Sequence, residues 1–221
     1  MFARWRFERG LKTLTKTDHP ALRAYAEADW PHSDCPASTA PFLALDFELD
    51  GLRKDAHLLQ AGWVSFEGRS IALANAQSID IRSDADLDAQ AVTIHMIGEE
   101  RAAMGQPVKT VIPSLIEALA GRIMIAHAAS IELTALQRAV KALLDVHLPI
   151  RAICTLILER EIHPNLAGSE AYRLGPTRER YGLPAYHAHD ALTDAIAAAE
   201  LFQAQLSRLP PDTTLARLEH T

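Results

Sequence analysis

The segment FLALDFEL, residues 42–49, places two acidic side chains inside an otherwise apolar run. A short apolar run of this kind predicts a buried strand. Because successive side chains of a strand alternate between its two faces, Asp46 and Glu48 share one face. Two like charges on a buried strand repel each other and resist desolvation unless a cation or a raised pKa relieves them. The pair predicts either a cation site or an edge strand with one solvated face.

The other segments predict an α/β domain in which helices flank a mixed five-stranded sheet. The 221 residues suit one such domain. Besides residues 42–49, we expect strands at 58–66 and 70–79, joined as a hairpin at Gly68, at 122–127, and near Ala152. We expect the main helices at residues 108–120, 130–144 and about 190–206, with a shorter one near Leu156.

The chain is expected to divide into a basic helical arm with its linker at residues 1–41, the main domain at 42–206, and a tail at 207–221. The net charge is −6, yet the first 25 residues carry a surplus of four positive charges. This arm is a candidate to dock on a polymerase or repair partner, on anionic lipid, or on its own domain. The tail begins with a Pro pair and is expected to fray.

The composition narrows the environment of the protein. Cys35 and Cys154 lie far apart with no CxxC pair, which argues against a zinc site or a disulfide framework and predicts a reducing compartment. No apolar stretch approaches the roughly 18 residues of a membrane span, and the N-terminus lacks the apolar centre of a secretory signal. We therefore expect a cytoplasmic protein with no membrane span.

The segment HAHDALTDA carries a second pair of chemically capable side chains, His189 and Asp194. On one continuous helix these two residues would point in different directions, so they converge only if His189 precedes the helix. Asp190 is a good N-cap, which places His189 in the loop and Asp194 in or near the first turn. A surface histidine before an ordinary Ala-rich helix remains the alternative.

Two further polar residues are candidates. Glu132 follows the strand at 122–127 on the first turn of a helix, where sites of α/β folds gather, although charge compensation at a helix start explains it equally. His95, in VTIHMIGEE, is either part of a site or a partly buried polar residue.

Taken in order, LDFELDG, HMIG, IMIAHAASIEL and HDALTDA resemble the DEDDh 3′–5′ exonucleases related to the proofreading epsilon subunit of bacterial DNA polymerase III, which have a ribonuclease H-like fold. The resemblance covers roughly residues 42–204. The DxE pattern of the family is met by Asp46 and Glu48, and its HxALxDA pattern by the segment from His189 to Ala195. HMIG looks like the HGIT segment of the family, which would put His95 beside the substrate.

The resemblance implies a hydrolase that removes nucleotides from the 3′ end of single-stranded DNA or RNA. Two Mg²⁺ or Mn²⁺ ions, about 4 Å apart, would be held by four carboxylates, with Glu48 and His189 in catalytic roles and His189 as the base. The metal ligands implied are Asp46, Glu48, Glu132 and Asp194. We expect the terminal nucleotide to stack near Phe47 and Leu49.

Basic side chains in YRLGPTRERYG, namely Arg173, Arg178 and Arg180, are either phosphate contacts or solvated charges, and Arg178 is the one we assign to the substrate. The sequence does not decide between DNA and RNA as the substrate, nor between a monomer and a homodimer.

Two departures from the family pattern favour an alternative function. The middle motif of the family reads HNxxFD, whereas this chain has Ala128 for the Asn and Glu132 for the Asp. The aspartate-threonine pair that follows in the family is Cys154 and Thr155 here. The alternative is a module of the same fold that binds a nucleic acid or a partner protein through a weakened or inactive site.

Overall fold

The computed structural model describes residues 2–51, 53, 56–85 and 87–219. Its sheet has six strands, β1 (Pro41–Leu49), β2 (Leu58–Glu67), β3 (Ser70–Ile71), β4 (Gln77–Asp80), β5 (Ile123–Ala126) and β6 (Ala152–Cys154). The strand order is β3-β2-β1-β5-β6, and β4 also pairs with β2. β1 pairs antiparallel with β2 and parallel with β5, and β5 pairs parallel with β6. The mixed sheet expected from the sequence is confirmed.

The number of strands differs from the expected five, because the strand predicted at residues 70–79 is interrupted. Its two ends form β3 and β4, which both pair with β2, and a short 3-10 helix at Leu73–Asn75 separates them. The interruption falls on the sequence LAN, and Ala and Asn are both depleted in strands. The hairpin itself is present, with its turn at Gly68, whose φ of 52° is a conformation that glycine adopts without a steric cost.

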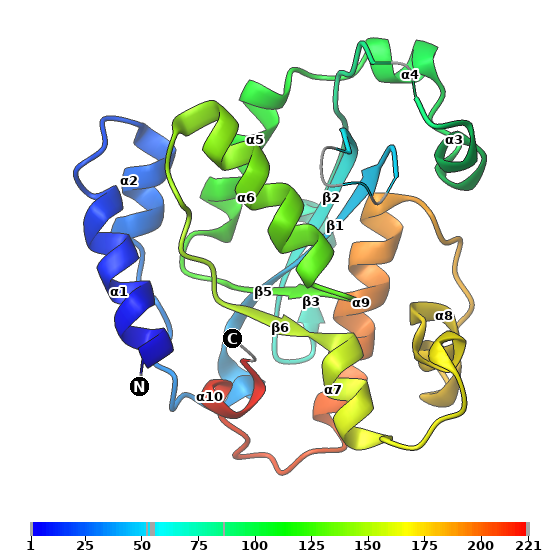
Figure 1. Cartoon of the computed structure of the whole chain (residues 1–221). Helices are drawn as coiled ribbons and strands as arrows, with labels where there is room; N and C mark the ends of the chain where they lie inside the picture. The colour runs from blue at the N-terminus through cyan, green and yellow to red at the C-terminus, as the bar shows by residue number, and fades with distance from the viewer. Residues whose placement is uncertain (1, 52, 54–55, 86, 220–221) are drawn as a thin grey trace.

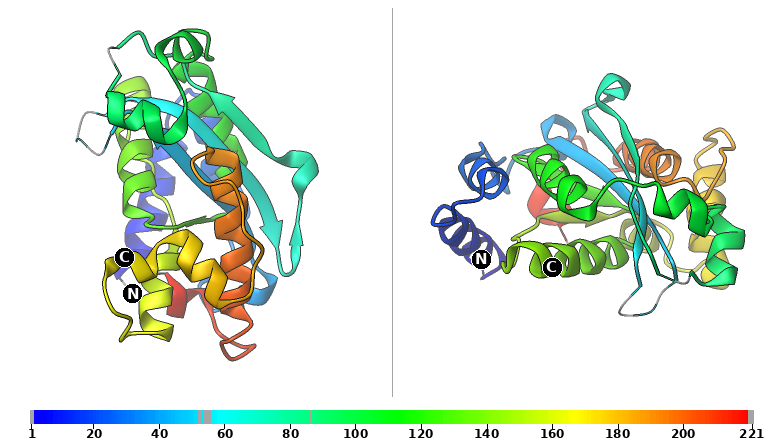
Figure 2. Two further views of the ribbon diagram at one scale, coloured as in Figure 1. Left: turned by 90° about the vertical axis from the view of Figure 1, so that its right-hand side faces the viewer. Right: turned by 90° about the horizontal axis from the view of Figure 1, so that it is seen from above.

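Helices cover both faces of the sheet (Figure 1 and Figure 2). They are α1 (Phe2–Leu14), α2 (Pro20–Glu27), α3 (Ala89–His95), α4 (Glu99–Ala103), α5 (Val108–Leu119), α6 (Ser130–Leu144), α7 (Thr155–Ile162), α8 (Leu174–Arg180), α9 (Ala191–Leu206) and α10 (Leu215–Leu218). Among the described residues no helix is both long and apolar enough to cross a membrane.

Alternation along β1 builds two separate cores. Leu43, Leu45 and Phe47 pack with α2, α5 and α6 in one core, whereas Phe42 and Ala44 pack with α9 in the other. Figure 2 shows α9 lying lengthwise over the sheet, on the face opposite α5. The even-numbered side chains of β1 therefore face α9, and this face includes the two acidic positions.

The N-terminal arm packs on the domain. Leu14, Leu22 and Tyr25 are buried in the same core as α5 and α6, and the Tyr25 hydroxyl donates a hydrogen bond to the backbone oxygen of Pro149 at 2.6 Å. Of the three docking partners considered for the arm, the structure shows contacts with its own domain. The division of the chain at residue 41 remains a prediction.

The prediction that the tail frays is wrong for its described part, residues 207–219. Leu215 and Leu218 of α10 are buried in the second core. Glu219 forms an ion pair with Arg151 at 2.6 Å. α9 ends at Leu206, before the Pro pair, and the chain stays ordered beyond that pair because the apolar side chains of α10 are buried in the core.

Candidate active site

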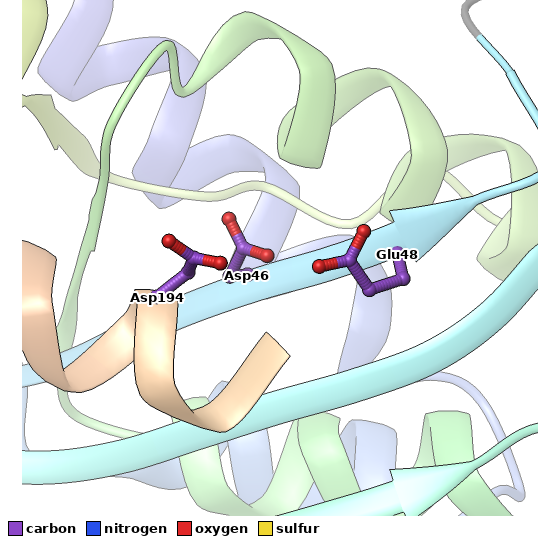
Figure 3. Close-up of side chains that lie close together, drawn as sticks. All are labelled: Asp46, Glu48 and Asp194. Atoms are coloured by element: carbon purple, nitrogen blue, oxygen red, sulfur yellow. The ribbon is translucent and has the colours of Figure 1, made fainter. Parts of the chain in front are cut away.

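Three carboxylates meet on the face of β1 that α9 covers. Asp46 and Glu48 come from β1 and Asp194 comes from the first turn of α9 (Figure 3). One oxygen of each carboxylate lies within 4.8 Å of the others. All three residues are partly buried, so water screens the repulsion between their carboxylates only in part.

The start of α9 has the local geometry that the sequence predicts. Asp190 is the N-cap, and its side chain accepts a hydrogen bond from the backbone N–H of Thr193 at 3.0 Å. His189 lies in the preceding loop with an exposed side chain and a φ of 70°. Its backbone N–H donates to Oδ2 of Asp194 at 2.7 Å. The loop conformation thus brings His189 and Asp194 together, which a continuous helix would prevent.

A glycine on β2 allows α9 to approach the sheet. Gly62 lies opposite Asp46 in the β1–β2 pairing. A Cβ atom at Gly62 would lie 2.0 Å from the backbone nitrogen of Leu192, so no larger residue fits without moving the helix. Two residues along the strand, Gln60 accepts a hydrogen bond from the backbone N–H of Ala191 at 2.8 Å. Together these two contacts hold the first turn of α9 against β2.

Burial raises the pKa of each carboxyl group in the cluster, and repulsion adds to the rise for Asp46 and Glu48. The pKa of Asp46 lies well above its ordinary range because of burial first and then the charges of Glu132 and Asp194. Burial, followed by repulsion from Asp194, raises the pKa of Glu48 to about 7. Burial also raises the pKa of Asp194, while hydrogen bonds from Tyr186 and His189 oppose the rise. Bound cations would relieve this repulsion, since carboxylate oxygens are the ligands that Mg²⁺ and Mn²⁺ prefer.

Glu132 is a buried carboxylate within electrostatic range of Asp46 and Glu48. It is 3% exposed on the first turn of α6, and its Oε2 has no hydrogen-bond partner among the described residues. Burial and then repulsion from Glu48 raise its pKa to about 8. A buried carboxylate oxygen without a partner is costly unless it is protonated or meets a cation. Asp46, Glu48 and Asp194 therefore have the ligand chemistry of a divalent metal site, and Glu132 as a fourth ligand remains a prediction.

The two apolar residues that we assigned to a nucleotide-stacking face point away from the carboxylates. Phe47 is 5% exposed and belongs to the core under α5, so this prediction is wrong. Strand alternation is the reason, because Phe47 falls between two residues that face α9. Leu49 is only partly buried, so a contact with substrate at this residue remains a prediction.

His95 lies at the end of α3, 5% exposed, and its Nδ1 accepts a hydrogen bond from the backbone N–H of Ile97 at 3.1 Å. Burial and the nearby charge of Arg101 lower the pKa of His95, and the charge of His189 adds to this effect. The neighbouring Met96 has a φ of 55° and is 81% exposed. His95 therefore lies within electrostatic range of His189, and a substrate contact at His95 remains a prediction.

Arg178 does not reach solvent, contrary to its assignment as a phosphate contact. Its side chain is 3% exposed and forms an ion pair with Glu200 at 2.7 Å. It also donates hydrogen bonds to the backbone oxygens of Ala197 at 2.8 Å and Pro184 at 3.1 Å. A guanidinium has five N–H donors in a fixed plane, which suits the joining of α8, the loop and α9. The local sequence RER indicates the charge of Arg178 but does not indicate that its side chain is buried.

Tyr186 is a site residue that the sequence reasoning missed. Its hydroxyl donates a hydrogen bond to Oδ1 of Asp194 at 2.9 Å, and its pKa is raised by burial and by that carboxylate. Nothing in the loop sequence distinguishes this tyrosine from a surface residue. Gln60 was missed as well, although a polar side chain inside the apolar strand LLQAGWVSF is a signal that could have found it.

The fold and the family are established by comparison with known proteins. The family model RNase_T, described as Exonuclease, matches residues 43–202. A comparison with curated protein sequences gives no match.

Several solved structures share the fold. A structure of exonuclease X in complex with 5′ overhanging duplex DNA is similar with a TM-score of 0.65 and 23% identity, over 80% of this chain and 97% of that one. A zinc-bound complex of E. coli exonuclease I with single-stranded DNA is similar with a TM-score of 0.68 and 14% identity, over 78% of this chain and 41% of that one. This chain thus spans about two fifths of exonuclease I.

These similarities confirm the ribonuclease H-like fold, with its mixed sheet flanked by helices. The family match covers most of the chain and includes both segments that supply the carboxylate cluster. The protein described by this sequence belongs to the exonuclease family.

Proposed function

We propose that this protein removes nucleotides from the 3′ end of single-stranded DNA or RNA, with two Mg²⁺ or Mn²⁺ ions as cofactors. The observation that carries the proposal is the convergence of Asp46, Glu48 and Asp194, within 4.8 Å, from segments far apart in the sequence. The similar structures of exonuclease I and exonuclease X hold single-stranded DNA and 5′ overhanging duplex DNA, which supports a DNA 3′ end as the first substrate to test.

Asp46, Glu48, Asp194 and Glu132 would hold the metal ions. When bound, divalent ions stabilise the charge that develops on a phosphodiester during hydrolysis and promote the ionisation of water. The protein contributes a partly buried site, which strengthens electrostatic interactions, and a first turn of α9 fixed by its N-cap and by Gln60.

His189 is the proposed general base. Its side chain is exposed and its backbone N–H donates to Asp194, and its charge lowers the pKa of Asp194, which supports an imidazole within electrostatic range of that carboxylate and open to water. A neutral imidazole nitrogen can take the proton of an attacking water molecule. His189 has a φ of 70°, a conformation that is strained for a residue other than glycine, and such strain is common at functional sites.

The test uses single-stranded DNA and RNA of the same sequence, labelled at the 3′ or the 5′ end, in the presence of Mn²⁺. The wild-type protein should release mononucleotides from the 3′ end, and Asp46→Ala should not. His189→Ala should bind Mn²⁺ as the wild type does and lose about 10²- to 10⁴-fold in turnover. His187→Ala, an exposed histidine in the same loop, is the matched control and should remain active.

Unchanged hydrolysis by His189→Ala would remove that residue from the mechanism. The alternative function, a nucleic-acid or partner-binding module, predicts a different result: the wild type would bind the oligonucleotide but be as inactive as Asp46→Ala. The carboxylate of Glu132 lies within electrostatic range of Asp46 and Glu48, which supports the enzyme, whereas Ala128 still favours the alternative.

We also propose a cytoplasmic location, which the two free cysteines, Cys35 and Cys154, support. A polymerase or repair protein as a partner, and association as a homodimer, stay proposals that size-exclusion chromatography with light scattering can test.

A further inference from the structure

Both oxygens of the Asp194 carboxylate accept a hydrogen bond from the protein. The Tyr186 hydroxyl donates to Oδ1 at 2.9 Å, and the backbone N–H of His189 donates to Oδ2 at 2.7 Å. Within the described residues no Lys or Arg pairs with this carboxylate. Because a donor binds each oxygen, the plane of the carboxylate is fixed.

Tyr186 is itself held in place by a buried cation. The guanidinium carbon of Arg178 lies 4.9 Å from the centroid of the Tyr186 ring. Arg178 is anchored by hydrogen bonds to the backbone of Ala197 and Pro184 and by its ion pair with Glu200. Two of these partners, Ala197 and Glu200, lie on α9, the helix that carries Asp194. Arg178 therefore links the Tyr186 ring to α9, the helix that carries the acceptor Asp194.

A second tyrosine in the same region makes a similar bond that serves a different carboxylate. The Tyr181 hydroxyl donates to Oε2 of Glu159 at 2.9 Å. Glu159 also receives hydrogen bonds from Arg180 at 3.1 Å and from Gln205 at 3.0 Å. Glu159 is thus bound by a guanidinium and an amide within the fold, whereas the Tyr186 and His189 donors to Asp194 are neutral and Asp194 belongs to the carboxylate cluster. The hydrogen bond of Tyr181 therefore serves the fold, whereas the hydrogen bond of Tyr186 reaches a carboxylate of the cluster.

We propose that Tyr186 is a positioning residue, which orients the Asp194 carboxylate toward Asp46 and Glu48, and that Arg178 keeps the Tyr186 ring in place. This inference rests on the proposed function of the cluster as a divalent metal site. Residues that bind to metal ligands by hydrogen bonds commonly change metal affinity or activity by 10- to 100-fold when they are removed. Without the hydroxyl, the Asp194 side chain would lose a donor that fixes its plane and could rotate away from Asp46 and Glu48.

The experiment measures Mn²⁺ binding by electron paramagnetic resonance, which detects the free ion, on the full chain without substrate. We expect the Kd for Mn²⁺ of Tyr186→Phe to rise by about 10-fold. Tyr181→Phe, the matched control, should keep the Kd of the wild type. Urea unfolding of both variants shows how much stability each hydroxyl contributes. Turnover of Tyr186→Phe should fall at limiting Mn²⁺ and recover at saturating Mn²⁺, which a general loss of stability does not produce.

An unchanged Kd for Mn²⁺ in Tyr186→Phe would overturn the positioning role, and so would an equal rise in Tyr181→Phe. Arg178→Lys is a second variant, which keeps the charge but removes the guanidinium that lies over the ring, and a smaller rise in Kd is expected. If the wild type shows no Mn²⁺ binding that Asp46→Ala removes, both this inference and the proposed function fail. Wild-type binding with an unaffected Tyr186→Phe rejects only the inference.

Discussion

The carboxylate cluster should make the metal-free protein less stable as pH rises. Glu48 has an ordinary pKa of 4.5, and burial with repulsion from Asp194 raises its pKa in the folded protein to about 7. The folded state therefore holds a proton on Glu48 that the unfolded chain releases at lower pH. Stability from this group is present below pH 4.5 and is lost as pH rises through 7, which is the sign for an acid whose pKa is raised by folding.

The magnitude follows from the difference between these two pKa values, 4.5 and about 7. Each pK unit corresponds to about 1.4 kcal/mol, so ionisation of Glu48 costs the folded state roughly 3 kcal/mol in total. Between about pH 5.5 and pH 8 the change is roughly 2 kcal/mol. This is an upper limit, since the side chain is partly exposed and solvent screens part of the repulsion.

The assay is urea unfolding at about pH 5.5 and about pH 8, first with EDTA and then with Mn²⁺. With EDTA the free energy of unfolding of the wild type should be lower at the higher pH. In Glu48→Gln the pH dependence should shrink by up to about 2 kcal/mol, because the group that titrates is gone. Glu67→Gln, an exposed glutamate at the end of β2, is the control and should behave as the wild type. Mn²⁺ should stabilise the wild type more at the higher pH, since the ion binds ionised carboxylates.

Equal pH dependence in Glu48→Gln and the wild type would show that folding does not raise the pKa of Glu48. Equal stabilisation by Mn²⁺ at both pH values would likewise refute the linkage between protons and cations.

Two backbone positions give further predictions that urea unfolding can test. Gly62→Ala would put a Cβ atom 2.0 Å from the backbone nitrogen of Leu192 and should lower the free energy of unfolding by about 3 kcal/mol or more, with loss of Mn²⁺ binding. Gly175→Ala, where nothing lies within 4 Å, should not destabilise the protein, and equal behaviour of the two variants would contradict the close approach of α9. Ala128 has a φ of 65°, so Ala128→Asn should stabilise by about 0.5 to 1 kcal/mol, because Asn tolerates this conformation better. Ala142→Asn, on an exposed position of α6, should have the opposite sign, and a lower urea midpoint for Ala128→Asn would reject the backbone explanation.

Those parts of the site that depend on local rules could be predicted from the sequence. Strand alternation placed Asp46 and Glu48 on one face, and the N-cap preference of Asp190 placed His189 outside the helix and Asp194 in its first turn. Both rules act over a few residues, so they hold whatever the rest of the fold does.

The errors concern side chains whose surroundings come from distant segments. Arg178 was expected at a phosphate because it is charged, but the carbonyls of α9 and of the loop offer it partners inside the protein. Phe47 was expected at a nucleotide, although the same alternation that grouped the carboxylates turns Phe47 into the core under α5. Charge and hydrophobicity describe a residue, whereas burial depends on what packs against it.

The sequence by itself determined a strand with two acidic side chains on one face and a capped helix start that carries a third. Only the tertiary structure decided that the third carboxylate meets the other two. That meeting depends on Gly62, which lets α9 approach β2, and it includes a hydrogen bond from Tyr186 to Asp194 that no local pattern predicts. The physical reason is that a contact between distant segments exists only when packing brings the two backbones close, and no local pattern encodes that distance.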